Sequence, residues 1–418
     1  MRQLENKLFF AAPWLLTLAM ATNADGAGFQ LSEHSANGLG RAYAGEAATV
    51  ENSSVIFRNP AAMSYFERTA TSVGGVLIAP SIDIAGSSAV FGSADQSDAA
   101  NGGLLPNFSV VQPMSDNWWI GLSMGSHFNT GVEYASDFGG THFGDLAEIT
   151  TADINLSIAK KVSPALSLGA GISAIWGEGR VRNSLPQVLG GGLGGATMLD
   201  LEGEDWTWTW NVGAMWQLDR NNRIGITYKH LATLELEGTA ASEVGLPAGS
   251  GNLPLELPAM VELASFHQLT DRLALHLGVN WSSWSRFESL TANIEGTIVE
   301  VKREDWQDTF KFSLGTTYQY SEAIVLRAGV AYDQPAAEEE HRTITIPDSD
   351  RFWYSAGIGY AISRNSSIDL GFTFIHFLDT DIRETFTPPA GSPLPADELN
   401  VKASGHAWLA GAQYSYQF

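Results

Sequence analysis

Apolar and polar residues alternate along most of the chain after residue 66. Between residues 206 and 218, every second position from Trp206 to Leu218 is apolar, and the positions between them are mostly polar or small. The same period of two recurs in residues 272–282 and 352–363. Because successive side chains of a strand point to opposite faces, this pattern predicts amphipathic β-strands.

Three features of these strands favour a membrane barrel over a soluble sandwich, whose strands would be shorter. The alternating runs often exceed the ~9–11 residues that cross a bilayer. Aromatic residues gather at the ends of the apolar face, as in an interfacial girdle. Short turns, for example near residues 163–164 and 270–271, alternate with longer segments rich in Gly, Pro and acidic residues. Short periplasmic turns and longer outer loops produce such an alternation.

The alternating segments number fourteen, an even number as expected for a bacterial single-chain barrel. We expect them to start near residues 68, 107, 118, 151, 165, 204, 222, 256, 272, 306, 323, 351, 366 and 403. We expect the long outer loops near residues 81–106, 130–150, 182–203, 238–255, 289–305, 335–350 and 380–402. The sequence therefore predicts an all-β fold, a 14-stranded antiparallel transmembrane barrel over residues 67–418.

By strand parity, six charged residues face the interior of this barrel. They are Asp153, Lys229, Glu262, Lys311, Arg327 and Asp369. A charge on the lipid face near the membrane midplane costs about 2–4 kcal/mol, which makes parity a usable guide. A lumen wall whose charges pair with one another, without a role in ligand binding, is the alternative explanation for each of them.

The first 66 residues do not follow this alternation. Residues 1–26 combine a basic start, an apolar run and a small-x-small end, which is typical of a cleaved signal peptide. A membrane anchor is the alternative, but the apolar run falls short of the ~20 residues that a spanning helix needs. Residues 27–66 have no regular period, yet their aromatic and Leu residues argue against disorder. Because fourteen strands leave a wide lumen, we expect this segment to plug the barrel as an N-terminal hatch, unlike in an open porin.

Composition narrows the classes of function. The 418 residues carry a net charge of −23, which disfavours nucleic-acid binding because that needs clustered positive charge. The chain has no Cys, and its nine His form neither an HExxH motif nor a cluster, so we expect no metal and no cofactor. Ser32 and His34 are two residues apart, which keeps a lipase-type barrel enzyme as an alternative.

The last strand ends on an aromatic residue. Phe418 follows Tyr414 and Tyr416 on the same face. A terminal aromatic residue in this setting looks like the signal by which the barrel-insertion machinery recognises its substrates, so we expect that machinery as a partner. An ordinary amphipathic strand is the alternative.

Four short blocks follow one another directly after the leader. They are Gly28-Phe29-Gln30-Leu31, Gly38-Leu39-Gly40-Arg41-Ala42-Tyr43, Gly45-Glu46 and Arg58-Asn59-Pro60-Ala61. Together they resemble the hatch of the FadL-type outer-membrane transporters of long-chain fatty acids and other hydrophobic compounds. Later blocks at residues 221–223, 281–285, 314–318 and 346–353 extend the resemblance over nearly the whole chain. It implies a plugged barrel in the bacterial outer membrane, a monomer by analogy, with a hydrophobic small molecule as its ligand.

The hatch supplies one group of candidate functional residues. Those expected to act in gating are Gly28, Phe29, Arg41, Glu46, Asn59, Pro60 and Ala61. We hypothesise that Arg41, Glu46 and Arg58 pair with the charged lumen wall, because a buried charge needs a partner. Pro60 would fix a tight turn; a turn that only links hatch and barrel is the alternative.

A second group is expected to bind ligand. In the outer loop near residues 185–200, Leu185, Leu189 and Leu193 form an apolar surface that the resemblance identifies with a capture groove. A packed loop that caps the barrel is the alternative. The resemblance also places basic residues near the carboxylate of a bound fatty acid. Lys302 matches one of them, whereas Asn183, with Arg182 beside it, stands at the position of the other. This departure leaves room for an uncharged ligand.

The resemblance further implies a kink in the third strand that opens the barrel wall sideways. The residues in this region are His127, Phe128, Asn129 and Gly131. An apolar ligand that leaves sideways enters the outer-membrane lipid and never crosses the polar lumen. We therefore expect uptake of hydrophobic compounds, foremost long-chain fatty acids. An importer of alkanes or aromatic hydrocarbons is the alternative within the family, and a non-specific porin is the alternative of another class.

Overall fold

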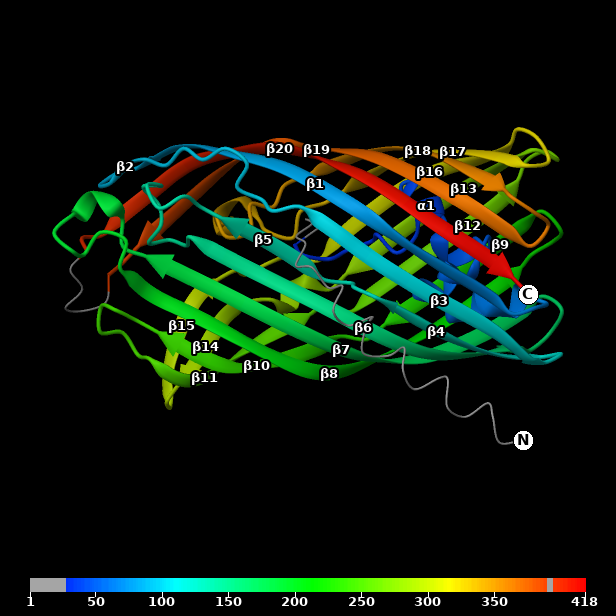
Figure 1. Ribbon diagram of the computed structural model, residues 1–418, viewed down its shortest axis with the longest axis horizontal. Coiled ribbons are helices and arrows are strands. Elements are labelled where there is room, and N and C mark those ends of the chain that lie inside the picture. The colour runs from blue at the N-terminus through cyan, green and yellow to red at the C-terminus, as the bar shows by residue number, and fades with distance from the viewer. Residues whose placement is uncertain (1–27, 389–393) are drawn as a thin grey trace.

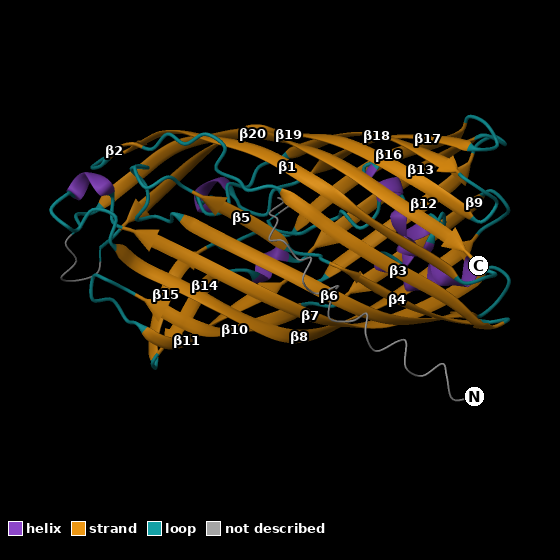
Figure 2. Ribbon diagram, in the orientation of Figure 1, coloured by secondary structure: helices purple, strands orange, loops and turns teal. Residues whose placement is uncertain are grey.

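A computed structural model describes residues 28–388 and 394–418 of the chain; the predicted signal peptide therefore lies outside the described residues. The described chain is a single antiparallel barrel, which Figures 1 and 2 show from the side. None of its helices has the length and the apolar character that crossing a membrane requires.

Nine strand spans of the barrel run without interruption. They are β1 (Ala70–Ser88), β3 (Gly103–Ser115), β6 (Leu146–Lys161), β7 (Leu166–Ser184), β8 (Thr197–Gln217), β17 (Ile324–Asp333), β18 (Arg351–Ala361), β19 (Ser366–Phe386) and β20 (Asp397–Gln417). The two-residue strand β2 (Gly92–Ser93) only pairs with the end of β1.

Five further spans are each broken into two strands. They are β4 (Trp118–Gly125) with β5 (Asn129–Glu133), β9 (Asn222–Lys229) with β10 (Ala232–Ala241), β11 (Gly249–Leu257) with β12 (Met260–Gln268), β13 (Leu273–Ser282) with β14 (Ser289–Ile294), and β15 (Thr297–Arg303) with β16 (Thr309–Gln319). Pairing of β1 with β20, from Ala70 opposite Gln417 to Ser88 opposite Leu399, closes the barrel. The prediction of fourteen antiparallel strands is confirmed.

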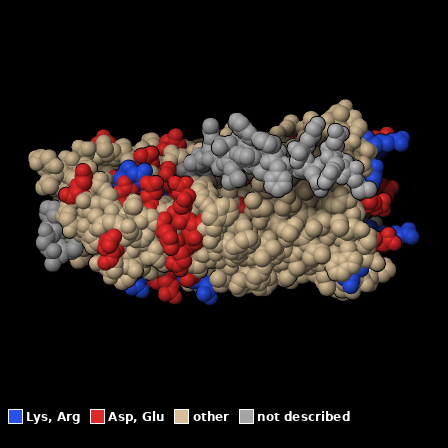
Figure 3. Space-filling view, turned by 60° about the horizontal axis from the view of Figure 1, so that its bottom comes forward, with Lys and Arg blue, Asp and Glu red and all other residues tan. Residues whose placement is uncertain are grey.

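The polarity of the wall reverses along the barrel. In the membrane-spanning half, Trp208 points outward and is 65% exposed, whereas Thr209 points inward and is buried. Towards the outer end, Leu234 and Leu236 point inward and are buried, and Glu237 points outward. Exposed Glu side chains on β7, β8 and β10 contribute to the acidic band that crosses the face in Figure 3. The barrel therefore projects beyond the lipid, and its projecting part has an apolar interior.

This reversal corrects the predicted outer loops. Residues 238–255, 289–305 and 380–402 are predicted to be loops, but most of their described residues belong to strands, and β7 and β8 also extend into the predicted loop at 182–203. Outside the lipid, acidic and small residues suffice on the outward face, so these extensions carry few of the apolar outward positions that mark a membrane strand.

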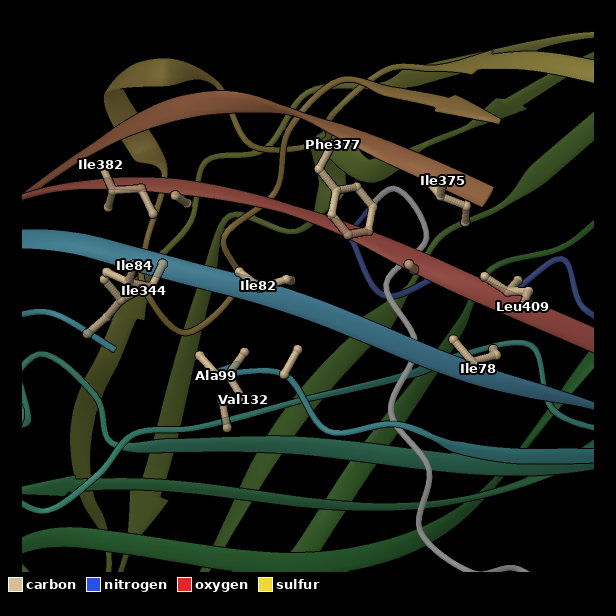
Figure 4. Close-up of a cluster of buried hydrophobic side chains, with 14 of the residues drawn as sticks. Ile78, Ile82, Ile84, Ala99, Val132, Ile344, Ile375, Phe377, Ile382 and Leu409 are labelled. Atoms are coloured by element: carbon tan, nitrogen blue, oxygen red, sulfur yellow. The ribbon is translucent and has the colours of Figure 1, made fainter. Parts of the chain in front are cut away.

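The apolar interior of the projecting part forms two large clusters. One joins β1, β19 and β20 through Ile82, Ile382 and Leu409, and it also includes Val132 and Ile344 (Figure 4). The other lines the opposite wall with side chains of β8, β10, β11 and β14. By contrast, the six charged residues predicted from parity lie in the lumen of the membrane-spanning half. Five of them are buried, and Lys229 lines a lumen cavity, so this prediction is confirmed.

Residues 28–66, called here the N-terminal segment, lie inside the barrel (Figure 1). The segment forms the short helices α1 (Ala36–Leu39), η2 (Glu46–Ala48), η3 (Ser53–Phe57) and η4 (Pro60–Tyr65). Small residues let its backbone touch the wall: a Cβ on Gly40 would lie 2.8 Å from the Cα of Gly357 on β18. Gly45, with φ of 72°, adopts the left-handed conformation that favours glycine.

Candidate functional site: a lumen pocket between the outer loops and the N-terminal segment

Charged groups hold the N-terminal segment to the wall. Arg58 pairs with Glu262 of β12 at 3.5 Å, as hypothesised. Arg41 and Glu46 do not pair with the wall but with each other, which corrects that part of the hypothesis. The link to the wall runs instead through Glu51, whose two oxygens lie 2.7 Å from Arg41 Nη1 and 2.9 Å from Arg327 Nη2. The sequence offered no motif that would have singled out Glu51.

Asn59, Pro60 and Ala61 form a helix start rather than a simple turn. The Asn59 Oδ1 atom accepts a hydrogen bond from the Ala61 N–H at 3.0 Å and so caps helix η4, which begins at Pro60. The Asn59 Nδ2 group donates to the carbonyl oxygens of Ala47, at 2.7 Å, and of Ala214 on β8, at 3.1 Å. One side chain thus joins the helix cap, a second part of the segment and the wall.

The third strand span is interrupted at residues 126–128, between β4 and β5. This is the region in which the family resemblance implies a kink; Gly131 lies beyond the interruption, within β5. The N-terminal segment pairs with the interruption: Leu31 N donates to His127 O at 2.7 Å, and Asn129 N donates to Phe29 O at 2.9 Å. Within the described chain, no ladder pairing joins residues 125–129 to residues 103–107 of β3.

Two histidines meet at this interruption. The rings of His34, in the N-terminal segment, and His127 have centroids 4.2 Å apart. The Nδ1 atom of His127 lies 2.6 Å from Asp153 on β6, and the Nε2 atom of His34 lies 2.8 Å from the Ser126 carbonyl oxygen. The interruption is therefore anchored to the N-terminal segment and to the neighbouring strand.

Phe29 occupies the centre of an aromatic cluster in the projecting lumen. Its ring centroid lies 4.7 Å from that of Trp284, 5.8 Å from that of Phe287 and 5.9 Å from that of Trp306. Gly28 before it has φ of 60°, and a Cβ there would meet the Trp306 ring at 2.5 Å. Only glycine lets the chain pass these rings in this conformation.

A small cavity of about 30 Å³ lies beside this cluster. Apolar side chains dominate its lining, among them Phe143, Ile149, Phe287 and Leu290, and Thr130, Asn183, Lys302 and Glu304 add polar groups. Lys302 donates to the carboxylate of Glu384 on β19 and to the Phe143 carbonyl oxygen at 3.2 Å. An apolar cavity with a few polar groups is the usual form of a site for a small hydrophobic ligand.

Asn183 and Arg182, the two neighbouring residues predicted to bind ligand, differ in their position relative to this pocket. Asn183 lines the cavity and donates from Nδ2 to the His142 carbonyl oxygen at 3.2 Å. Arg182 is absent from the described lining and instead pairs with Asp145 at 2.9 Å. The sequence missed Glu304 and Glu384, because nothing in the local pattern relates either residue to a pocket.

The family model described as "Outer membrane protein transport protein (OMPP1/FadL/TodX)" matches residues 17–418. The chain belongs to this family. It is 31% identical over 452 residues to the long-chain fatty acid transport protein of Escherichia coli O6:H1, covering 99% of this chain and 100% of that protein. It is 34% identical over 453 residues to outer membrane protein P1 of Haemophilus influenzae strain Rd, covering 97% and 98%.

Solved structures of the OMPP1/FadL/TodX family share the fold. A Pseudomonas aeruginosa FadL homologue matches with a TM-score of 0.86 at 23% identity, covering 94% of this chain and 100% of the other. The Pseudomonas putida toluene transporter TodX matches with a TM-score of 0.70 at 18% identity, again covering 94% and 100%. The predictions of the family and of an outer-membrane location are confirmed.

Family membership also makes the chain a transport protein and not an enzyme. The geometry at Ser32 and His34 agrees, because His34 Nδ1 approaches the backbone carbonyl oxygen of Ser32, at 3.2 Å, and not its hydroxyl group. A nucleophile and its general base would need to share a hydrogen bond.

The outer loop between β7 and β8 carries helix η5 (Gln187–Leu189). Leu185 is buried against Met198 and Leu394, and Leu189 packs against them. Leu193 and Val188 point away, with 46% and 70% of their surfaces exposed. The loop is therefore packed on one side and presents apolar side chains to the outside on the other.

The C-terminus lies at the end of the barrel opposite this loop (Figure 1). Phe418 N donates to the Thr69 carbonyl oxygen at 2.9 Å, next to the start of β1. The Phe418 ring is 63% exposed and lies 4.9 Å from the ring of Tyr416. Recognition of this residue by the barrel-insertion machinery stays a prediction.

Proposed function

We propose that this protein takes up hydrophobic compounds across the outer membrane, with long-chain fatty acids as its first substrates. The observation that carries the proposal is the reversal of lumen polarity: an apolar pocket in the projecting half lies above a polar, plugged lumen in the membrane-spanning half. A hydrophobic ligand is stabilised in the projecting half of the lumen and excluded from the membrane-spanning half.

Capture begins at the outer loops. The exposed Val188 and Leu193 and the cluster of Leu185, Leu189 and Met198 behind them form an apolar surface at the mouth of the barrel. Apolar surface exposed to water on a monomer favours binding of an apolar partner. Curated relatives named long-chain fatty acid transport proteins support a fatty acid as this partner.

The N-terminal segment acts as the hatch. The cavity beside Lys302, at about 30 Å³, holds no more than a few water molecules, so an alkyl chain enters only when the pocket expands. Phe29 fills the adjoining aromatic cluster and belongs to the segment that pairs with the interrupted strand. Withdrawal of Phe29 would enlarge the pocket and release residues 127–129 in one movement.

Release is sideways. Towards the membrane-spanning half, a cavity of about 50 Å³ beside the N-terminal segment is lined by charged and polar side chains, among them Lys229, Arg58, Glu262 and Asn280, and also by apolar ones such as Phe57 and Met260. An alkyl chain that crossed it would have to displace water from these charged groups, which is unfavourable. The gap between residues 103–107 and 125–129, which no ladder pairing bridges within the described chain, offers a path into the outer-membrane lipid instead. A single barrel contains the whole route, so the protein works as a monomer driven by the substrate gradient.

Uptake by liposomes that contain the purified protein tests this function against the porin alternative. We expect labelled palmitate to enter faster than in protein-free liposomes, while a labelled sugar such as arabinose stays outside. Entry of arabinose together with equal palmitate rates in both kinds of liposome would replace the proposal with a non-specific pore.

One observation favours the hydrocarbon alternative: Lys302 already has a carboxylate partner in Glu384. Solved channels for toluene and other monoaromatic hydrocarbons also share the fold. Displacement of labelled palmitate by unlabelled palmitate or by hexadecane decides between the two classes. If Lys302 recognises the carboxylate, palmitate competes better, and Lys302→Ala removes about 1.5–3 kcal/mol of that preference. Equal competition that Lys302→Ala leaves unchanged identifies a hydrocarbon importer.

A further inference from the structure

Glu304 places a carboxyl group in the wall of the lumen pocket. It lies between β15 and β16, on the outer side of the membrane-spanning strand β16, and is 1% exposed. Its Oε2 atom accepts a hydrogen bond from Trp306 Nε1 at 3.0 Å. Its Oε1 atom is buried and, within the described chain, has no hydrogen-bond partner, although Glu304 lines the cavity. A buried polar atom without a partner is costly unless a ligand completes it.

Among residues 28–388 and 394–418, no cation forms an ion pair with Glu304. Lys302, two residues earlier, donates to Glu384, and the Glu384 carboxylate also accepts from the Ile344 N–H at 2.7 Å. Arg351 pairs with Asp348 behind the pocket. Glu304 therefore lies near one lysine and near the carboxylate of Glu384, and a neighbouring negative charge disfavours ionisation of Glu304.

Two further charged residues lie near the pocket. Glu148 on β6 contributes to the lining, and Glu288, whose carbonyl oxygen accepts from the Glu304 N–H at 2.8 Å, is exposed. Both are acidic. Burial raises the pKa of Glu304 to about 8, with Glu384 adding to the rise and Lys302 opposing it. At neutral pH, Glu304 is a neutral carboxyl group with one O–H donor.

We propose that protonated Glu304 binds the ligand's head group: its O–H donates a hydrogen bond to the carboxylate of a fatty acid, whose other oxygen accepts from Lys302. This rests on the proposed function of the pocket. A lysine ammonium has three donors, of which the structure uses two, so one is free for the ligand. The fatty acid enters as an anion and meets the ammonium group of Lys302, the protonated carboxyl group of Glu304 and the carboxyl groups of Glu384 and Glu148. If Glu304 lost its proton, one more carboxylate would face the incoming one.

The proposal makes binding of an ionised fatty acid depend on a proton that the protein holds. A fatty alcohol is different, because its hydroxyl can accept from a protonated Glu304 or donate to an ionised one. The two ligands differ only in the head group, so the apolar contribution of the chain cancels between them.

The test compares dodecanoate and 1-dodecanol by calorimetric titration of the full-length mature protein in lipid nanodiscs. Between pH 7 and pH 9.5, we expect the affinity for dodecanoate to fall on the order of 30-fold, because the fraction of protonated Glu304 falls by that factor for a pKa near 8. The affinity for 1-dodecanol should change less than about 2-fold. At pH 9, titrations in buffers of different ionisation enthalpy should show uptake of nearly one proton per dodecanoate and none per dodecanol.

Two variants separate Glu304 from other titrating groups. Glu304→Gln keeps the shape and the donor but cannot titrate, so dodecanoate should bind at pH 7 within a few-fold of the unchanged protein, without the loss at pH 9.5 and without proton uptake. Glu338→Gln changes an exposed carboxylate outside the pocket and should retain both effects. Heat-modifiable migration on gels shows that each variant is a folded barrel.

The possible results distinguish a failure of the role of Glu304 from a failure of the proposed function. Dodecanoate binding that is independent of pH, or a pH dependence that Glu304→Gln retains, overturns the role of Glu304 while leaving a hydrophobic pocket in place. If neither ligand binds at any pH, both this inference and the proposed function fail. Binding of dodecanol alone at pH 7 also overturns the inference, because the pocket would then reject a carboxylate.

Discussion

The Glu51 carboxylate lies between two buried guanidinium groups, 2.9 Å from Arg327 Nη2 on the barrel wall and 2.7 Å from Arg41 Nη1 in the N-terminal segment. Arg41 is completely buried. We predict that Glu51→Gln destabilises the packed segment by about 3 kcal/mol, the lower end for a broken buried pair, because Glu46 and Asp369 each keep one Arg partnered.

Conductance across a planar lipid bilayer measures this loosening, since a displaced segment opens the lumen. Glu51→Gln should raise the single-channel conductance or its open fraction. The control, Glu322→Gln, alters an exposed carboxylate in a short turn and should leave the conductance unchanged. An unchanged conductance in Glu51→Gln would show that the charge link does not hold the segment in place.

Asn59 contributes more to the segment than Pro60 does. Asn59→Ala removes the cap of η4 and two donated hydrogen bonds, so we predict a loss of about 1–3 kcal/mol in the local stability of residues 59–66. Pro60→Ala, at a first helical position, should cost below about 1 kcal/mol. Amide hydrogen exchange of these residues gives both values. Equal effects of the two substitutions would contradict the role assigned to the Asn59 side chain.

His142 makes the outer end of the barrel sensitive to acid. The ring is fully buried beside Phe91, Phe143 and Phe386 and lies 3.0 Å from Asp397 Oδ2, though without hydrogen-bond geometry. Burial lowers the pKa of His142 to about 4, and Asp397 opposes this shift. Because the unfolded pKa is about 6.5, the contribution of His142 is complete above pH 6.5 and falls by about 3 kcal/mol as the pH drops to 4.

Protection factors of residues 141–145, measured between pH 7 and pH 4.5, check this prediction. His142→Gln should be less stable at pH 7 but should lose little further stability in acid. His341→Gln, at a partly exposed position of helix η7 (Glu339–His341), should retain the acid sensitivity. The same acid loss in His142→Gln as in the unchanged protein would assign the effect to another group.

The exposed side of the outer loop is predicted to capture the ligand. Val188→Glu places a charge on the apolar surface, and we expect palmitate uptake at low concentration to fall about 10-fold, as for the loss of one buried aliphatic side chain at ~1.5 kcal/mol. Gln187→Glu adds the same charge to the neighbouring exposed residue and should reduce uptake far less. Equal losses would attribute the effect to charge repulsion rather than to apolar contact.

The sequence predicted the barrel best where lipid imposes one polarity on its outward face. Leu277 is 42% exposed and its neighbour His276 is buried, so the alternation on β13 marks a membrane strand. On β10, Leu236 is buried and Glu237 exposed, the opposite arrangement. Such strands beyond the lipid resemble polar loops in sequence, and their extent became visible only with the strand pairing.

The pocket was predicted only in part for a similar reason. Lys302 was found through the resemblance, and it does line the cavity. Its partner Glu384 is 82 residues away on β19, and the contact depends on how β15 and β19 face each other across the lumen. Glu51 and Arg327 are likewise joined only once the segment has folded into the barrel. Contacts between distant elements leave no local period from which to predict them.

Photocrosslinking with a palmitate that carries an aliphatic diazirine tests sideways release most directly. Peptide mapping after irradiation of outer membranes should find label in the pocket, at Phe143 or Leu290, and at the interrupted strand, at Phe128 or on residues 103–107 of β3. It should find none at Thr227 or Asn280 in the polar lumen. Label at Thr227 and Asn280, with none at Phe128 or residues 103–107, would contradict sideways release and show that the ligand passes through the lumen to the periplasm.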